Sequence, residues 1–147
     1  MEQRISVFEK GTNAMRALYG VGAYLAKSSI ERPLLNLICF RVSQINGCAY
    51  CVNHHTKEAR RLGETEPRAY LISVWREAPN VFNDEERLLL EMTEEITLIH
   101  HHGLSDRLYE KAIQLLGEVK TAQVIMAIIT INAWNRIGVS LNMAPQL

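Results

Sequence analysis

Hydrophobic residues recur through most of this chain at intervals of three and four positions, the spacing that places side chains on one face of an α-helix. No segment shows the sustained alternation of apolar and polar residues that is typical of a β-strand. The pattern predicts helices over residues 12–27, 34–45, 48–62, 65–77, 83–102, 105–117 and 119–141. We therefore expect an all-α helical bundle of about six to seven helices that forms a single domain over residues 1–147.

Residues at the predicted helix ends support these boundaries. Asn46-Gly47 and Gly63 follow apolar-periodic segments and tolerate the left-handed backbone that commonly ends a helix. Asn83 and Glu86 have the spacing of a capping box, in which each side chain accepts from the other residue's backbone N–H. Gly117 separates the two last predicted helices.

The helix predicted over residues 119–141 is apolar on more than one side. Such a helix is either central in the bundle or buried against another subunit. We therefore expect a homo-oligomer.

Composition and charge exclude several functional classes. The chain has 147 residues, and its 48% of apolar residues is ordinary for a globular protein. Sixteen basic and sixteen acidic side chains cancel without forming a basic block, which argues against nucleic-acid binding.

We expect a soluble, cytoplasmic protein that has no membrane partner. The first residues lack the basic and then apolar pattern of a signal peptide. The longest apolar run, Val124–Ile131, is far shorter than the roughly 20 residues that cross a bilayer. Three cysteines suit a reducing compartment, where a C-x-x-C pair is more often redox-active or metal-bound than structural.

The most informative motif is Cys48-x-x-Cys51-x-x-x-His55. On a helix these three side chains form one row, which brings two thiols next to a proton acceptor. Cys48 falls near a helix N-terminus, where the macrodipole favours a thiolate, whereas Cys51 is closer to His55. The spacing therefore leaves open which sulfur attacks first. Three roles stay open for Tyr50: it lines a pocket, it donates a proton, or it is simply exposed on the surface.

Two thiols and a nearby proton acceptor are the groups that thiol redox chemistry requires at a minimum. We therefore take Cys48, Cys51 and His55 as the candidate catalytic residues. The pair can form a disulfide in the looser first turn of a helix, because a regular helix holds facing Cβ atoms ~5–6 Å apart. A thiolate that meets a peroxide becomes a sulfenic acid, which the second thiol condenses into a disulfide. This chemistry requires no metal or other cofactor.

Two other interpretations of the motif remain open. Two cysteines and a histidine supply three ligands for a zinc-binding structural module, with His54 or a distant histidine as the fourth. The chain has no second C-x-x-C pair, however, and structural zinc sites usually draw one from elsewhere. Alternatively, the dithiol belongs to a non-catalytic redox-sensing protein and switches its oligomeric state.

Other chemically distinctive residues have simpler interpretations. Cys39, inside an apolar run, is expected to be buried and inert. Trp75 and Trp134 are expected to anchor the core or an interface rather than contact a substrate. Asn132 and Asn135 are polar positions in an apolar helix, and either line a pocket or are capped by solvent or a partner chain.

The segment of residues 41–60, which contains the motif, resembles the core of the alkylhydroperoxidase D-like proteins of the carboxymuconolactone decarboxylase superfamily. Residues 63–66, 75–78 and 131–136 resemble further stretches of the same family, so that the likeness extends from about residue 12 to residue 141. The resemblance implies an all-helical fold that assembles into homo-oligomers, trimers and hexamers among them.

The resemblance also implies reduction of organic hydroperoxides or hydrogen peroxide by the cysteine pair. In this family a histidine and a glutamate form a proton relay, and a dithiol reductant, which in the best-known members is a lipoyl-bearing protein, returns the electrons. Cys48, Cys51 and His55 match the cysteines and the histidine.

Two positions depart from the family pattern. Asn36 stands where the relay glutamate is expected, so that Glu31, Glu58 or a water would have to replace it. Tyr50 stands where the two-domain alkylhydroperoxidase has a histidine.

Overall fold

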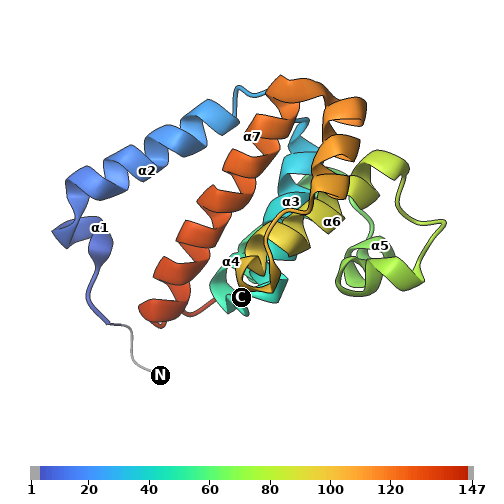
Figure 1. Ribbon diagram of the computed structural model, residues 1–147. Coiled ribbons are helices and arrows are strands. Elements are labelled where there is room, and N and C mark those ends of the chain that lie inside the picture. The colour runs from blue at the N-terminus through green and yellow to red at the C-terminus, as the bar shows by residue number, and fades with distance from the viewer. Residues whose placement is uncertain (1–3, 146–147) are drawn as a thin grey trace.

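A computed structural model describes residues 4–145. Within that range the chain forms seven α-helices, two 3-10 segments and no strand (Figure 1). The helices are α1 (Val7–Lys10), α2 (Thr12–Leu25), α3 (Arg32–Ile45), α4 (Ala49–Arg61), α5 (Glu66–Leu71), α6 (Asp84–Thr97) and α7 (Asp106–Ser140), and the 3-10 segments are η1 (Ile72–Glu77) and η2 (Ile99–His101). The prediction of an all-α bundle is confirmed.

Two of the predicted helices differ in detail from the structure, and one short helix was not predicted. The helix predicted over residues 65–77 is α5 followed by η1, in which Val74 leaves the helical region. The helix predicted over 83–102 ends at Thr97 and continues as η2, after which His102 is left-handed with a φ of 102°. The short helix α1 was not predicted, because it is four residues long and buries none of them.

Gly117 changes the direction of the chain inside α7. Its φ of 75° and ψ of 167° lie outside the helical region, in a conformation open to glycine and strained for other residues. The segment before it and the long C-terminal segment after it run in different directions (Figure 1). The two helices predicted on either side of residue 117 are therefore correct, although they join without a loop.

The main core lies where α3, α6 and α7 pack on one another. Its fully buried side chains include Ile38 and Val42 of α3, Leu89 of α6, and Val124 and Ile128 of α7. Long apolar runs in the sequence thus supply this three-way contact, and α4 packs against α3 and α7.

Among residues 4–145, α7 is the one helix that is long and apolar enough to cross a bilayer by length and composition. The central helix of a soluble core meets the same criterion. Here α7 packs against α2, α3, α4 and α6, and its polar residues Gln123, Asn132 and Asn135 are buried and hydrogen-bonded to other parts of the chain. These contacts bury only part of its apolar surface.

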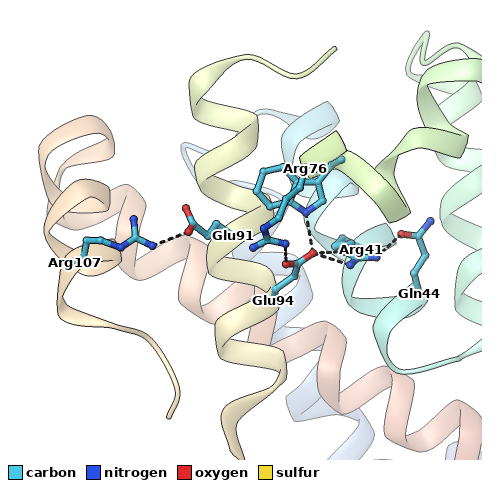
Figure 2. Close-up of polar contacts among 7 residues, drawn as sticks. Arg41, Gln44, Arg76, Glu91, Glu94 and Arg107 are labelled. Carbon is cyan, nitrogen blue, oxygen red and sulfur yellow. Dashed lines mark hydrogen bonds and ion pairs between the residues drawn. The ribbon is translucent and has the colours of Figure 1, made fainter. Parts of the chain in front are cut away.

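A second cluster joins η1 to α3 and α6 around Trp75, which is buried as predicted. The Trp75 indole Nε1 donates to Glu94 at 2.8 Å, and Arg41 donates to the same carboxylate through Nε at 2.9 Å and Nη2 at 2.7 Å. Arg76 also pairs with Glu94 (Figure 2). Burial raises the pKa of Glu94, but these hydrogen bonds outweigh it and hold the pKa below its usual value.

Candidate active site

Cys48 begins α4 and Cys51 lies in its first turn. Cys48 is the N-cap, with a φ of −83° and ψ of 94°, and its sulfur accepts from the Cys51 backbone N–H at 3.4 Å. The two residues are joined by a disulfide, and their Cα atoms are 5.3 Å apart. The expectation that this pair lies at a helix N-terminus and is able to form a disulfide there is confirmed. Both residues are buried, with 1% of Cys48 and 6% of Cys51 exposed.

The turn before Cys48 is held by buried polar groups from α7. Gly47, with a φ of 65°, reverses the chain between α3 and α4. The Asn46 amide donates to Asn132 Oδ1 at 2.9 Å and to Asn135 Oδ1 at 3.0 Å, and Asn135 donates to Ser43 Oγ at 3.1 Å. Asn132 and Asn135 therefore anchor the turn. The expectation that they line a pocket, or are capped by solvent or a partner chain, is wrong, because both amides are hydrogen-bonded inside the bundle.

Gly138 of α7 lies directly against the sulfurs. A Cβ at this position would be 2.9 Å from Cys48 Sγ and 3.7 Å from Cys51 Sγ. The role of Gly138 was not predicted from the sequence. The available signal was a glycine inside an apolar helix, where a glycine usually has a packing reason.

A cavity of about 490 Å³ borders Cys51 and His55. Its lining is mostly apolar and comes from α1, α2, α3, α4, α7 and the segment after α7. It is lined by Phe8, Tyr19, Gly22, Leu25, Leu35, Cys39, Tyr50, Cys51, His54, His55, Ala127, Thr130, Ile131, Trp134, Ile137, Gly138 and Met143. Tyr50 is thus a wall of the cavity, one of its three expected roles, whereas Cys48 lies behind Cys51 and does not line it.

Three aromatic rings from distant parts of the sequence form one wall of this cavity. Trp134 stacks on Phe8 with ring centroids 6.4 Å apart and contacts Tyr19 at 5.1 Å. Trp134 packs against the main core, as expected, and it also lines the cavity that contains Cys51. The N-terminal segment is held over this end of α7, where the Arg4 backbone N–H donates to the Leu141 carbonyl at 3.1 Å.

His55 is paired with Asn36 of α3. His55 Nδ1 lies 3.0 Å from Asn36 Oδ1, and Asn36 Nδ2 donates to the His55 backbone carbonyl at 3.1 Å. Burial, and secondarily the neighbouring His54, lower the pKa of His55 to about 3. The ring is therefore neutral near pH 7, and one of its nitrogens is free to accept a proton.

Cys39 lines the same cavity but has a different character from the pair. Burial raises the pKa of its thiol to about 12, so it stays protonated near neutral pH. The interpretation of Cys39 as an inert thiol agrees with this environment.

Neither candidate for the missing relay glutamate reaches the cavity. Glu58 lies 3.7 Å from both Arg32 and Arg61, and Glu31 is exposed ahead of α3. No carboxylate lines the cavity within residues 4–145. Across the same residues, no group of three or more His, Cys, Asp or Glu side chains is placed to hold a metal ion, which gives the zinc interpretation no geometric support.

Comparison with known proteins identifies the family. The sequence model of the carboxymuconolactone decarboxylase family matches residues 12–95, more than half of the chain, with both cysteines and His55 inside the match. The chain belongs to this family. The chain is also similar to the uncharacterized protein YdfG of Bacillus subtilis strain 168, with 38% identity over 141 residues, which are 96% of this chain and 95% of YdfG.

Solved structures agree on the fold. Atu0492 of Agrobacterium tumefaciens, a protein of unknown function proposed to be the antioxidant defence protein AhpD, superimposes with a TM-score of 0.93 and 34% identity over 99% of both chains. An uncharacterized peroxidase-related protein of Silicibacter sp. TM1040 has a TM-score of 0.81 over 92% of this chain and 71% of its own, and its 19% identity shows a shared fold alone. The resemblance to the AhpD-like branch of the carboxymuconolactone decarboxylase family is confirmed.

Proposed function

We propose that this member of the carboxymuconolactone decarboxylase family is a thiol-dependent peroxidase that reduces organic hydroperoxides through Cys48, Cys51 and His55. One observation carries the proposal: Cys51 and His55 face one cavity, and Cys48 lies behind Cys51 within disulfide reach. The family match and the structural likeness to Atu0492 support it.

In the proposed cycle, the Cys51 thiolate attacks one oxygen of the hydroperoxide and the O–O bond breaks. The alkoxide takes a proton and leaves as an alcohol, while Cys51 becomes a sulfenic acid. The Cys48 thiol then attacks the Cys51 sulfur, and the hydroxyl group leaves as water when the disulfide forms. The two thiols thus supply two electrons and two protons, and an external dithiol restores them by thiol–disulfide exchange.

Cys51 is the proposed attacking sulfur because it lines the cavity, whereas Cys48 is shielded by Cys51 and Gly138. It also lies in the first turn of α4, where the helix dipole favours the thiolate. His55 is one turn further along the same helix and accepts the thiol proton directly or through one water.

The apolar cavity favours an organic hydroperoxide over hydrogen peroxide. An alkyl or aryl group the size of a leucine or phenylalanine side chain gains about 1.5–3 kcal/mol when it is transferred from water to such a surface. Hydrogen peroxide has no apolar surface to bury and gains none of this binding energy.

The buried disulfide also restricts the reductant. With 1% of Cys48 and 6% of Cys51 exposed, attack on either sulfur requires a slender dithiol that enters the cavity. A dihydrolipoyl group on a flexible arm has this shape, and the rigid surface of a globular dithiol protein does not. The proposed partner is therefore a lipoyl-bearing protein in a reducing compartment such as the cytoplasm.

A homo-oligomer, trimer or hexamer, is the proposed assembly. Val119, Ala122, Met126 and Ile129 are exposed, and their spacing of three, four and three places them on one side of α7. Contiguous exposed apolar residues of this kind mark interaction surfaces. A second copy of the chain is the proposed occupant of this side.

Steady-state consumption of cumene hydroperoxide tests the function, with dihydrolipoamide compared with glutathione and thioredoxin as reductants. Turnover with dihydrolipoamide and one intramolecular Cys48–Cys51 disulfide after oxidation, measured by alkylation and mass spectrometry, is the expected result. If both cysteines stay alkylatable after oxidant treatment, the proposal is wrong. Oxidation that changes the oligomeric state without repeated turnover would instead support the redox-sensing alternative.

A further inference from the structure

We propose that Asn36 is a positioning residue that holds His55 as the Nδ1–H tautomer, so that Nε2 receives the Cys51 proton and passes it to the leaving alkoxide. The inference rests on the proposed peroxidase function. It assigns a role to the residue that stands where the family pattern has a glutamate.

The hydrogen bonds of Asn36 determine which way its amide points. Nδ2 donates to the His55 backbone carbonyl at 3.1 Å, and this leaves Oδ1 facing His55 Nδ1 at 3.0 Å. A flipped amide would set its oxygen against the carbonyl oxygen, and neither of these atoms has a hydrogen to donate. The observed orientation therefore satisfies both contacts.

The orientation of the amide in turn determines the tautomer of His55. An amide oxygen only accepts hydrogen bonds, so the ring nitrogen 3.0 Å from it must carry a hydrogen. A neutral imidazole carries one N–H, and Nε2 is then the nitrogen with the free lone pair. His55 therefore accepts the Cys51 proton at Nε2.

An amide partner has a different effect from a carboxylate, because it carries no charge that stabilises an imidazolium ion. The ionisable groups around His55 do not supply that charge either. On α4 its neighbour is His54, with ring centroids 5.0 Å apart, and the cavity lining from α7 contains no ionisable side chain. Asn36 also borders a second cavity of about 150 Å³, where Glu64 is paired with Arg68 at 3.0 Å.

The proton therefore stays on His55 only briefly. It moves from the Cys51 sulfur to Nε2 when the thiolate forms, and from Nε2 to the alkoxide oxygen when the O–O bond breaks. This transfer begins and ends with neutral His55, so it balances within one turnover and needs no relay glutamate.

Nitrogen-15 NMR of the histidine rings in the reduced protein tests the tautomer without relying on activity. The expected spectrum shows a protonated Nδ1 and an unprotonated Nε2 for His55, with no titration between pH 5 and 8. A proton on Nε2 in the wild-type protein would overturn the inference.

Three variants link the tautomer to catalysis. Asn36→Leu removes the acceptor, and we expect mixed tautomers of His55 and a fall of at least about tenfold in the rate of Cys51 alkylation and in kcat/KM. Asn36→Asp keeps an acceptor oxygen but adds a charge, so the Nδ1–H tautomer is retained and the pKa of His55 rises. The acid limb of the pH–rate profile then moves to higher pH, because the neutral, proton-accepting form of His55 is lost earlier as pH falls.

Gln44→Leu is the control, because Gln44 lies on the same helix as Asn36 and does not contact His55. This variant changes none of these readouts.

An unchanged tautomer and an unchanged alkylation rate in Asn36→Leu would refute the positioning role. Failure of the peroxidase function looks different. In that case hydroperoxide is not turned over by the wild-type protein, while the NMR spectrum still reports the Nδ1–H tautomer and its loss in Asn36→Leu.

Discussion

Gly138 and Cys48 are packed so closely that the added methyl group of an alanine at position 138 would stand 2.9 Å from the Cys48 sulfur. The backbone of α7 at Gly138 thus packs directly against the two cysteine sulfurs. Real Cβ contacts are longer than this, so an alanine there must displace either the sulfur or the helix.

Gly138→Ala is expected to lower stability by about 1–3 kcal/mol, the usual cost of overpacking, and to slow disulfide formation. Thermal unfolding and the rate of thiol loss after addition of oxidant measure the two effects. The matched control is Gly20→Ala, since Gly20 is an exposed helix residue with no atom near its added Cβ. That change should raise stability by up to about 1 kcal/mol. Equal behaviour of both variants would contradict the packing argument.

The order of attack predicts different products from the two serine variants. In Cys48→Ser, Cys51 should react with one equivalent of hydroperoxide and stop at a sulfenic acid that dimedone traps. In Cys51→Ser, no sulfenic acid should form at Cys48, because that sulfur does not line the cavity. Peptide mass spectrometry locates the adduct, and dimedone on Cys48 in the second variant would reverse the assignment.

The aromatic rings of Phe8, Tyr19 and Trp134 should determine the preference for organic hydroperoxides over hydrogen peroxide. Trp134→Ala removes the ring that contacts Phe8 and Tyr19, so kcat/KM for cumene hydroperoxide should fall roughly ten- to a hundredfold, from about 1.5–3 kcal/mol of lost burial. The value for hydrogen peroxide should change little. Tyr70→Ala, at an exposed tyrosine that does not line the cavity, is the control. A parallel loss for both peroxides would show that Trp134 acts on structure rather than on substrate binding.

Glu94 should contribute stability that depends on pH. Glu94→Gln removes charge-assisted hydrogen bonds from Arg41, Trp75 and Arg76 and should cost about 1.5–3 kcal/mol at pH 7. The pKa of Glu94 is lowered in the folded state, so its contribution is full above the ordinary carboxyl pKa. That contribution is lost as pH falls through the folded pKa, where denaturation curves of the variant and the wild type should converge.

Glu91 provides a comparison on the same helix (Figure 2). Its partner Arg107, 2.7 Å away, has a mostly exposed side chain, so Glu91→Gln should cost only about 0–1 kcal/mol. Equal losses for the two variants would mean that the buried network around Glu94 adds nothing beyond a surface pair.

The exposed apolar side of α7 should determine assembly. Ile129→Glu places a charge among Val119, Ala122 and Met126 and should reduce the oligomer to a monomer, as measured by light scattering. Tyr109→Glu, at an exposed residue before the bend at Gly117, is the control. A wild-type protein that is monomeric at micromolar concentration would contradict the proposed assembly.

Much of the fold could be predicted from local pattern. The helix ends at Asn46-Gly47 and Gly117, and the capping box of Asn83 and Glu86, depend on residues close together in the chain. The position of Cys48 at a helix N-terminus was predictable for the same reason. The break within residues 65–77 was not, because Val74 has no turn-forming character, and its neighbour Trp75 packs into a cluster with residues of α3 and α6 that are distant in the sequence.

The sequence by itself determined the helical class of the protein and the row of two thiols and a histidine, because both follow from spacing along one helix. Only the tertiary structure decided which sulfur faces the cavity, that Trp134 lines it, that Asn132 and Asn135 support the turn, and that Asn36 and Gly138 meet the row. These relationships join residues up to about a hundred positions apart. They depend on how α3, α4 and α7 pack, which a local pattern of apolar and polar residues does not specify.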